Sequence, residues 1–359
     1  MVNKKLNIAL VGCGRISKSH IKAIIQLDSQ AKLIAICDEN KERVIETEKF
    51  FLEQLKINKL DFTKPKLFNT FEELLKEHKN NFIKIDLIIL ATPSGLHPIQ
   101  TIAAAKSKIN VCTEKPMALN YYDGLKMCQA CDENKVKLFV VKQNRLNPTL
   151  IDLKEKVNNK MFGNIALIEL NVFWQRPQSY YDQDRWRGTK KLDGGALMNQ
   201  ASHYVDLLEW IGGPLKSINA KVATISRKIE TEDTAVLILK WKNGALGTMA
   251  VTMLTYPKNI EGSITIIGDK GSAKVGGMAL NKYEYYHFQD ELNSDEMENI
   301  NYEPKNVYGS GHYKYYENMI NSLQNNEVPI CNGLSGLSSI KIINAAYKSH
   351  ETNKTINLN

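Results

Sequence analysis

LNIALVGCGRISKSHIKAIIQLDSQAKLIAICD, residues 6–38, lays out a strand, a glycine turn, a helix, a second strand and an acid, in that order. The apolar run 6–11 predicts a strand buried on both faces of a parallel sheet. Residues 15–27 have helical periodicity, and the second apolar run, 32–37, ends at Asp38. This layout is typical of a dinucleotide-binding βαβ unit, although an ordinary glycine turn remains an alternative.

Each residue of this turn has a physical role in the expected site. Gly12 allows the tight turn, Gly14 lets the backbone approach a pyrophosphate, and the following helix directs its N–H groups at the anion. The third glycine position of the fingerprint holds Ser17, which is small enough for close packing of helix on strand. Asp38 can accept hydrogen bonds from a ribose diol. Because Glu39 adds a second acid where a 2′-phosphate would lie, we expect NAD rather than NADP.

The composition is that of an ordinary globular chain. Its 359 residues, 43% hydrophobic and 24% charged, are enough for two domains. No apolar run approaches the roughly 18 residues that span a bilayer, and Met1–Lys5 leads straight into the first strand, so we expect a cytoplasmic protein without a membrane partner. The net charge of +8 comes from cations interleaved with acids, which argues against nucleic acid and modestly favours an anionic substrate.

Cysteine and histidine patterns do not indicate a metal. The six cysteines are scattered in apolar settings, as expected of reduced thiols. Cys128 and Cys131 form a C-x-x-C within a helical pattern, and no second pair lies nearby. The seven histidines include no HExxH or comparable cluster. We therefore expect no metal site.

The element pattern predicts an α/β protein of two domains. Strands alternate with helices up to residue 146, which predicts a doubly wound Rossmann domain over residues 1–146. After that, adjacent alternating strands with few helices predict an α+β domain over residues 147–359, with a large, mainly antiparallel open sheet. Its expected strands are 165–174, 216–226, 234–241, 245–255 and 260–267, its expected helices are 195–211, 313–324 and 336–350, and 289–306 is expected to be a surface excursion.

Two places carry candidate chemistry. Lys115 ends a predicted sheet strand, and Pro116 keeps it extended; the alternative is one surface lysine among many. In the predicted helix 195–211, Asn199 and His203 are an i, i+4 pair whose side chains can converge. A lone histidine on such a helix is more often a core residue, but the amide partner and the preceding Gly-Gly favour a functional role.

The motifs as a set give a family resemblance. They are VGCGRIS (11–17), ATPSGLHP (91–98), EKPMAL (114–119), GGALMNQASHYVDLLEWIGGP (194–214) and GSITIIGDKGSA (262–273). The chain resembles the glucose–fructose oxidoreductase/inositol dehydrogenase (Gfo/Idh/MocA) family of NAD(P)-dependent sugar oxidoreductases over nearly its whole length. Residues 175–210 most resemble the UDP-N-acetylglucosaminuronate 3-dehydrogenases of the WlbA/WbpB type.

This resemblance implies a reaction and a set of residues. It implies NAD-dependent oxidation of the C3′ hydroxyl of UDP-N-acetylglucosaminuronic acid to a 3-keto sugar, on a route to surface polysaccharides. Lys115 is then the lysine of the E-K-P motif and His203 the histidine of the second motif. Many relatives have aspartate where this chain has Asn199, which leaves open whether Lys115 or His203 takes the proton. The predicted catalytic residues are Lys115, His203 and Asn199.

The remaining predicted contacts follow the same motifs. The predicted cofactor-binding residues are Gly12, Gly14, Arg15, Ile16, Asp38, Thr92, Pro93, Ser94, His97, Glu114, Lys115 and Gln143. The predicted substrate-binding residues are Arg145, Arg176, Tyr180, Tyr181, Arg185, Arg187, Asn199, His203 and His312. For each arginine the alternative is a solvated surface cation.

Other functions remain open. One is a different sugar or polyol dehydrogenase of the family, such as an inositol dehydrogenase. Another is a non-catalytic NAD-sensing regulator, against which the presence of both Lys115 and His203 argues. The resemblance also leaves open whether NADH is released or is reoxidised in place by 2-oxoglutarate, and it implies a homodimer or homotetramer.

Overall fold

Six parallel strands form the sheet of the first half of the chain, in the order β3-β2-β1-β4-β5-β6. The strands are β1 (Leu6–Val11), β2 (Ala31–Cys37), β3 (Lys66–Phe68), β4 (Leu87–Leu90), β5 (Asn110–Thr113) and β6 (Leu138–Val140). β4 is fully buried along its length, as expected for a strand covered on both faces. The order reverses between β1 and β4, and ligands of such sheets bind at this switch point.

Three of the helices of this part begin at a capping side chain. The helices are α1 (Ser17–Gln26), α2 (Lys41–Ile57), α3 (Phe71–Lys79), α4 (His97–Lys106), α5 (Tyr121–Asn134) and α10 (Gly311–Asn325), with a 3₁₀ turn η1 (Ser94–Leu96). The Thr70 hydroxyl accepts the Glu73 N–H at 3.2 Å and so caps α3. Asn40 and Asn120 cap α2 and α5 in the same way.

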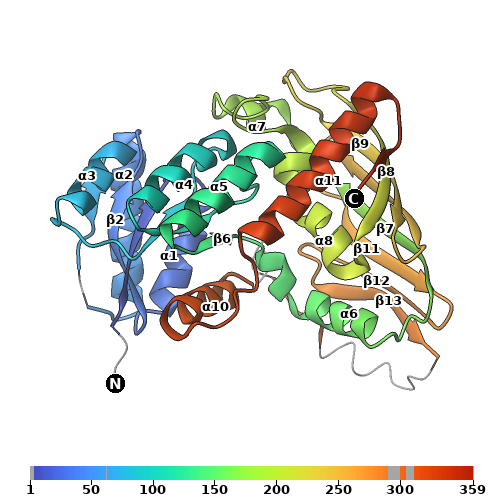
Figure 1. Cartoon of the computed structure of the whole chain (residues 1–359), viewed down its shortest axis with the longest axis horizontal. Coiled ribbons are helices and arrows are strands. Elements are labelled where there is room, and N and C mark those ends of the chain that lie inside the picture. The colour runs from blue at the N-terminus through green and yellow to red at the C-terminus, as the bar shows by residue number, and fades with distance from the viewer. Residues whose placement is uncertain (1–3, 62, 290–299, 305–310, 359) are drawn as a thin grey trace. The chain divides into compact units, whose positions relative to one another are not determined.

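The computed structural model describes residues 4–61, 63–289, 300–304 and 311–358. Its contacts divide the chain into two units, Met1–Val141 with His312–Leu337, and Lys142–Gly311 with Ser338–Asn359 (Figure 1). The sequence prediction placed one boundary between residues 146 and 147, and it made no provision for the return of 312–337 to the first unit. That boundary stays a prediction.

Eight strands form the sheet of the second unit, in the order β13-β12-β11-β7-β10-β9-β8-β14. β7 and β10 pair in parallel and the other neighbours are antiparallel, so the predicted mainly antiparallel sheet is confirmed. The strands are β7 (Ile165–Phe173), β8 (Leu215–Ala223), β9 (Thr234–Trp241), β10 (Leu246–Thr252), β11 (Glu261–Gly268), β12 (Gly271–Gly276), β13 (Lys282–Phe288) and β14 (Ile356–Asn357). β12 and β13 were not predicted.

One face of this sheet packs against helices. Along β9, the side chains of Leu237 and Leu239 are buried, whereas Val236 and Ile238, which alternate with them, are exposed. The helices of the unit are η2 (Gln143–Leu146, 3₁₀), α6 (Pro148–Asn158), α7 (Gln178–Asp182), η3 (Ala196–Gln200, a π-turn), α8 (Ser202–Gly212) and α11 (Gly333–Thr352), which starts in the first unit. α8 and α11 lie over the sheet in Figure 1.

Two further points concern the predicted surface excursion and helices long enough to cross a membrane. The predicted surface excursion 289–306 lies largely outside the described residues. Among the residues that the structure describes, no helix is both long and apolar enough to cross a membrane.

Candidate active site

The glycine turn after β1 has the geometry that the sequence predicted. Gly12 has a φ of +99°, and a side chain there would collide with the carbonyl oxygen of Ala91 at the end of β4. A Cβ on Gly14 would meet nothing within 4 Å, so the backbone there is open to close approach by a ligand. Ser17, at the third glycine position, donates to the Gly14 carbonyl at 2.6 Å and closes the turn.

Asp38 is fixed beside this turn. One carboxylate oxygen accepts the Cys13 N–H at 2.7 Å, and the other accepts the Asn40 N–H at 2.9 Å. Each oxygen keeps capacity for a further hydrogen bond, as a ribose diol requires. The open backbone at Gly14 and this carboxylate fit NAD. Of the other residues predicted here, Arg15 is exposed and Ile16 directly precedes α1.

His97 lies between the loop after β4 and the loop after β5 and contacts a backbone carbonyl of each. Its Nδ1 lies 2.9 Å from the Pro116 carbonyl oxygen, and its Nε2 lies 2.9 Å from that of Thr92. The ring is buried, and burial lowers its pKa. A neutral imidazole has a single N–H, so His97 donates to one of these two carbonyls, and its ring lies between the two predicted cofactor loops, which include Pro93 and the buried Ser94.

Lys115 follows β5, as predicted, and its backbone is held by the preceding residue. The Glu114 N–H donates to the Leu90 carbonyl at 2.8 Å, which continues the sheet by one residue. The Lys115 N–H donates to the Glu114 carboxylate at 3.1 Å. Glu114 is buried, and its other oxygen lies 3.3 Å from His20 Nε2. The sequence prediction named Glu114 but missed His20.

In the second unit, His203 is buried near the start of α8. The Gln143 amide nitrogen lies 3.2 Å from His203 Nε2, so the amide donates and the ring nitrogen accepts. Gln143 was predicted as a cofactor contact. That role stays a prediction, and the contact within the described structure orients the candidate catalytic imidazole.

The predicted continuous helix 195–211 is wrong, and the correction concerns Asn199. Residues 196–200 form a π-turn in which the Ala201 N–H bonds to the Ala196 carbonyl, and α8 begins only at Ser202. The i, i+4 spacing of an α-helix therefore does not relate Asn199 to His203. The Asn199 amide nitrogen instead donates to the buried carboxylate of Asp193.

Glu232 causes the irregular start of this segment. Its buried carboxylate accepts the Leu197 N–H at 2.8 Å, while its backbone carbonyl accepts the Ala196 N–H at 3.1 Å. Gly195 has a φ of +93°, and any side chain there would collide with the same carboxylate. Glu232 thus accepts the N–H groups of Ala196 and Leu197, and the closeness of its carboxylate to residue 195 requires glycine there. The sequence prediction missed both Glu232 and Asp193, although Asp193 directly precedes the Gly-Gly pair.

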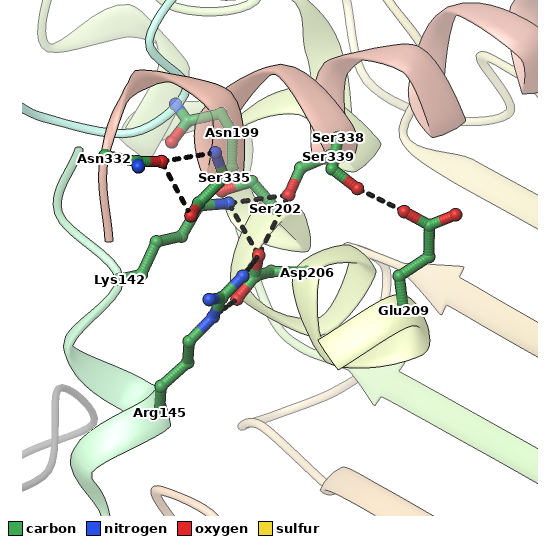
Figure 2. Close-up of polar contacts among 10 residues, drawn as sticks. All are labelled: Lys142, Arg145, Asn199, Ser202, Asp206, Glu209, Asn332, Ser335, Ser338 and Ser339. Carbon is green, nitrogen blue, oxygen red and sulfur yellow. Dashed lines mark hydrogen bonds and ion pairs between the residues drawn. The ribbon is translucent and has the colours of Figure 1, made fainter. Parts of the chain in front are cut away.

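Arg145, a predicted substrate contact, is committed to an internal ion pair (Figure 2). Its Nε donates to one carboxylate oxygen of Asp206 on α8 and its Nη2 donates to the other, each at 2.7 Å. Lys142 lies 3.3 Å from the same carboxylate and donates to Ser339 on α11 at 2.7 Å. Burial alone would raise the pKa of Asp206, but the two cations lower it to about 2.

Four of the other predicted substrate contacts form an arginine–tyrosine stack. The Arg187 and Arg176 guanidiniums lie 4.3 and 5.4 Å from the centre of the Tyr180 ring, and Tyr181 packs edge-on at 5.1 Å. Such stacking holds guanidiniums in a defined plane. Arg185 is exposed. His312 belongs to the first unit, where its ring lies 6.3 Å from that of His20.

Two models of one oxidoreductase family match successive parts of the chain. Residues 6–142 match the model of an oxidoreductase family, NAD-binding Rossmann fold, and residues 154–358 match that of an oxidoreductase family, C-terminal alpha/beta domain. The WlbA dehydrogenase of Bordetella pertussis, solved with NADH and UDP-GlcNAcA, is 46% identical with a TM-score of 0.91, covering 100% of this chain and 99% of its own.

Two more relatives extend the comparison. The WlbA dehydrogenase of Chromobacterium violaceum, also solved with NADH and UDP-GlcNAcA, is 42% identical with a TM-score of 0.89, covering 100% of this chain and 97% of its own. Myo-inositol 2-dehydrogenase of Thermotoga maritima is 24% identical over 98% of each chain. The chain therefore belongs to the Gfo/Idh/MocA oxidoreductase family and is an NAD-dependent dehydrogenase.

Proposed function

We propose that this protein oxidises the C3′ hydroxyl of UDP-N-acetylglucosaminuronic acid to the 3-keto sugar, in nucleotide-sugar biosynthesis for surface polysaccharides. The observation that carries the proposal is the identity of 46% over the full length with a dehydrogenase solved with NADH and UDP-GlcNAcA. An inositol dehydrogenase is the second candidate, supported by similarity at 24% identity over 98% of the chain.

The chemistry assigns a task to each group of residues. Oxidation of a secondary alcohol requires that the hydroxyl proton leave to a base and the carbon's hydride to an acceptor, which NAD supplies when bound. We assign proton removal to Lys115 or His203. The Gln143 contact orients the His203 ring, and the Glu114 carboxylate holds the Lys115 backbone, so each side chain starts from a fixed point.

The same reasoning assigns the anionic part of the substrate. A uronate and a diphosphate require cations with hydrogen-bond donors, and planar guanidiniums match both groups. Arg176 and Arg187, stacked on Tyr180, are the arginines that we propose for this role. Arg145 remains a candidate, but the pairing with Asp206 occupies two of its nitrogens.

The test is a turnover assay at 340 nm with NAD and either UDP-N-acetylglucosaminuronic acid or myo-inositol. We expect the nucleotide sugar to be preferred, and preference for the polyol would refute the proposal in favour of the second candidate. Lys115→Ala and His203→Ala should each lower kcat by about 10²–10⁴-fold, the usual contribution of an acid–base group. The exposed Lys106→Ala on α4 is the matched control. Full turnover in both catalytic variants would contradict the assigned roles.

Other measurements address the remaining proposals. If NADH is reoxidised in place, catalytic amounts of NAD will support formation of the 3-keto sugar, measured directly, when 2-oxoglutarate is added and will not do so without it. A homodimer or homotetramer is read by light scattering of the purified protein. The cytoplasmic location remains part of the proposal.

A further inference from the structure

A buried polar cluster of the first unit links three separate elements. His20 lies on α1, Glu114 follows β5 and Tyr316 lies on α10. The Tyr316 hydroxyl is 2.6 Å from His20 Nδ1, and His20 Nε2 is 3.3 Å from the Glu114 carboxylate. The second oxygen of that carboxylate accepts the Lys115 N–H at 3.1 Å. His20 and Tyr316 are both 0% exposed.

The Glu114 carboxylate is the ionised member of this cluster. Burial alone would raise its pKa, but the neighbouring His20, Lys115 and His312 outweigh burial and hold the pKa of Glu114 at about 2. An ionised carboxylate can only accept hydrogen bonds, and His20 Nε2 lies at ion-pair distance from it. Burial raises the pKa of Tyr316 well above its usual range, so the hydroxyl beside His20 Nδ1 keeps its proton. The imidazole thus lies between two polar groups, one at each ring nitrogen.

We propose that His20 and Tyr316 are positioning residues, which hold the Glu114 carboxylate in the orientation that fixes the backbone of Lys115. α1 begins directly after the glycine turn, so the cluster ties the helix that faces the cofactor pyrophosphate to the segment carrying the candidate catalytic lysine. The effect on turnover rests on the proposed function. The effect on the Lys115 backbone does not.

The test compares two adjacent tyrosines of α10. Tyr315 is also buried, but its hydroxyl lies 3.9 Å from the Cys112 thiol and not on the His20 ring. In the full-length protein with NAD, we expect Tyr316→Phe to speed hydrogen exchange of the Lys115 amide about tenfold, as expected when one hydrogen bond of a buried network is lost. Tyr315→Phe should leave that exchange unchanged. With UDP-N-acetylglucosaminuronic acid, Tyr316→Phe should lower kcat about tenfold with KM within twofold, and Tyr315→Phe should match wild type.

Each outcome bears on one claim. Equal amide exchange at Lys115 in wild type and Tyr316→Phe, or equal acceleration in both tyrosine variants, would overturn the positioning role. Failure of the wild type to oxidise the nucleotide sugar would refute the proposed function, and the exchange result would still decide the positioning role. Should Tyr316→Phe not fold, His20→Ala removes the ring that lies against Glu114, and it must accelerate the same amide for the proposal to stand.

Discussion

Replacing Glu232 by glutamine should remove a large pH dependence of folding stability. Burial raises the pKa of Glu232 to about 7, and Asp193 adds to this effect, against the bonds from Leu197 and Tyr347 that favour the ionised form. The number of hydrogens available for the bonds around Glu232 also favours its protonated form. The single Tyr347 hydroxyl lies 2.7 Å from the Gly194 carbonyl, which can only accept, and 2.9 Å from the Glu232 carboxyl. If Tyr347 donates to the carbonyl, Glu232 must supply the hydrogen of the second bond.

The direction and size of this pH dependence follow from the different proton affinities of Glu232 in the folded and the unfolded chain. Below the ordinary pKa of 4.5, both the folded and the unfolded chain are protonated at this residue, so it contributes no pH dependence. Between pH 4.5 and about 7, the folded protein keeps a proton that the unfolded chain has released, so the free energy of unfolding falls as pH rises. Each tenfold change in proton affinity is worth about 1.4 kcal/mol, so the full loss is about 3 kcal/mol above pH 7.

Denaturant unfolding of wild type and Glu232→Gln from pH 5 to pH 8.5 measures this loss. The free energy of unfolding of the variant, relative to wild type, should increase by about 3 kcal/mol across that range, because glutamine remains neutral. Glu230→Gln is the matched control, since Glu230 is exposed on the same loop and should show the wild-type profile. Parallel profiles for wild type and Glu232→Gln would refute the reasoning.

Two further predictions concern the glycine turn and the Arg145 ion pair. Gly12→Ala should lower both stability and NADH affinity, because its side chain would collide with the Ala91 carbonyl, whereas Gly14→Ala should fold normally and lose affinity only; thermal melts and NADH fluorescence titrations separate these effects. Arg145→Met should cost about 3 kcal/mol of unfolding free energy by leaving the buried Asp206 with one cation fewer, and an unchanged denaturation midpoint would contradict a structural role for Arg145.

The cofactor half of the site could be predicted because its signals are local. A buried strand, a glycine that must adopt positive φ and an acid at the end of the next strand each report on their own neighbourhood. The structure placed Gly12, Gly14 and Asp38 around one turn, as expected. Lys115 at the end of β5 was predictable for the same reason.

The supporting residues depend on contacts that are distant in sequence. His20 meets Tyr316 almost three hundred residues later, and periodicity cannot say on which unit a helix such as α10 packs. Glu232 meets Leu197 across a helix, a strand and a loop. Since neither pair leaves a mark within one helical or strand period, local patterns indicated the candidate catalytic residues and missed the residues that hold them.

The asparagine at position 199 has a physical explanation in these contacts. Its amide nitrogen donates to the Asp193 carboxylate, whose other oxygen accepts the Gly188 N–H at 2.6 Å. An aspartate at position 199 would bring two carboxylates within hydrogen-bond distance in a buried setting, and one of them would have to take up a proton at a raised pKa. Glu232 already adds a third acid nearby, since Asp193 contributes to its raised pKa. The amide is therefore the side chain that the fixed Asp193 requires, and the carboxylate at this point of the structure belongs to Asp193.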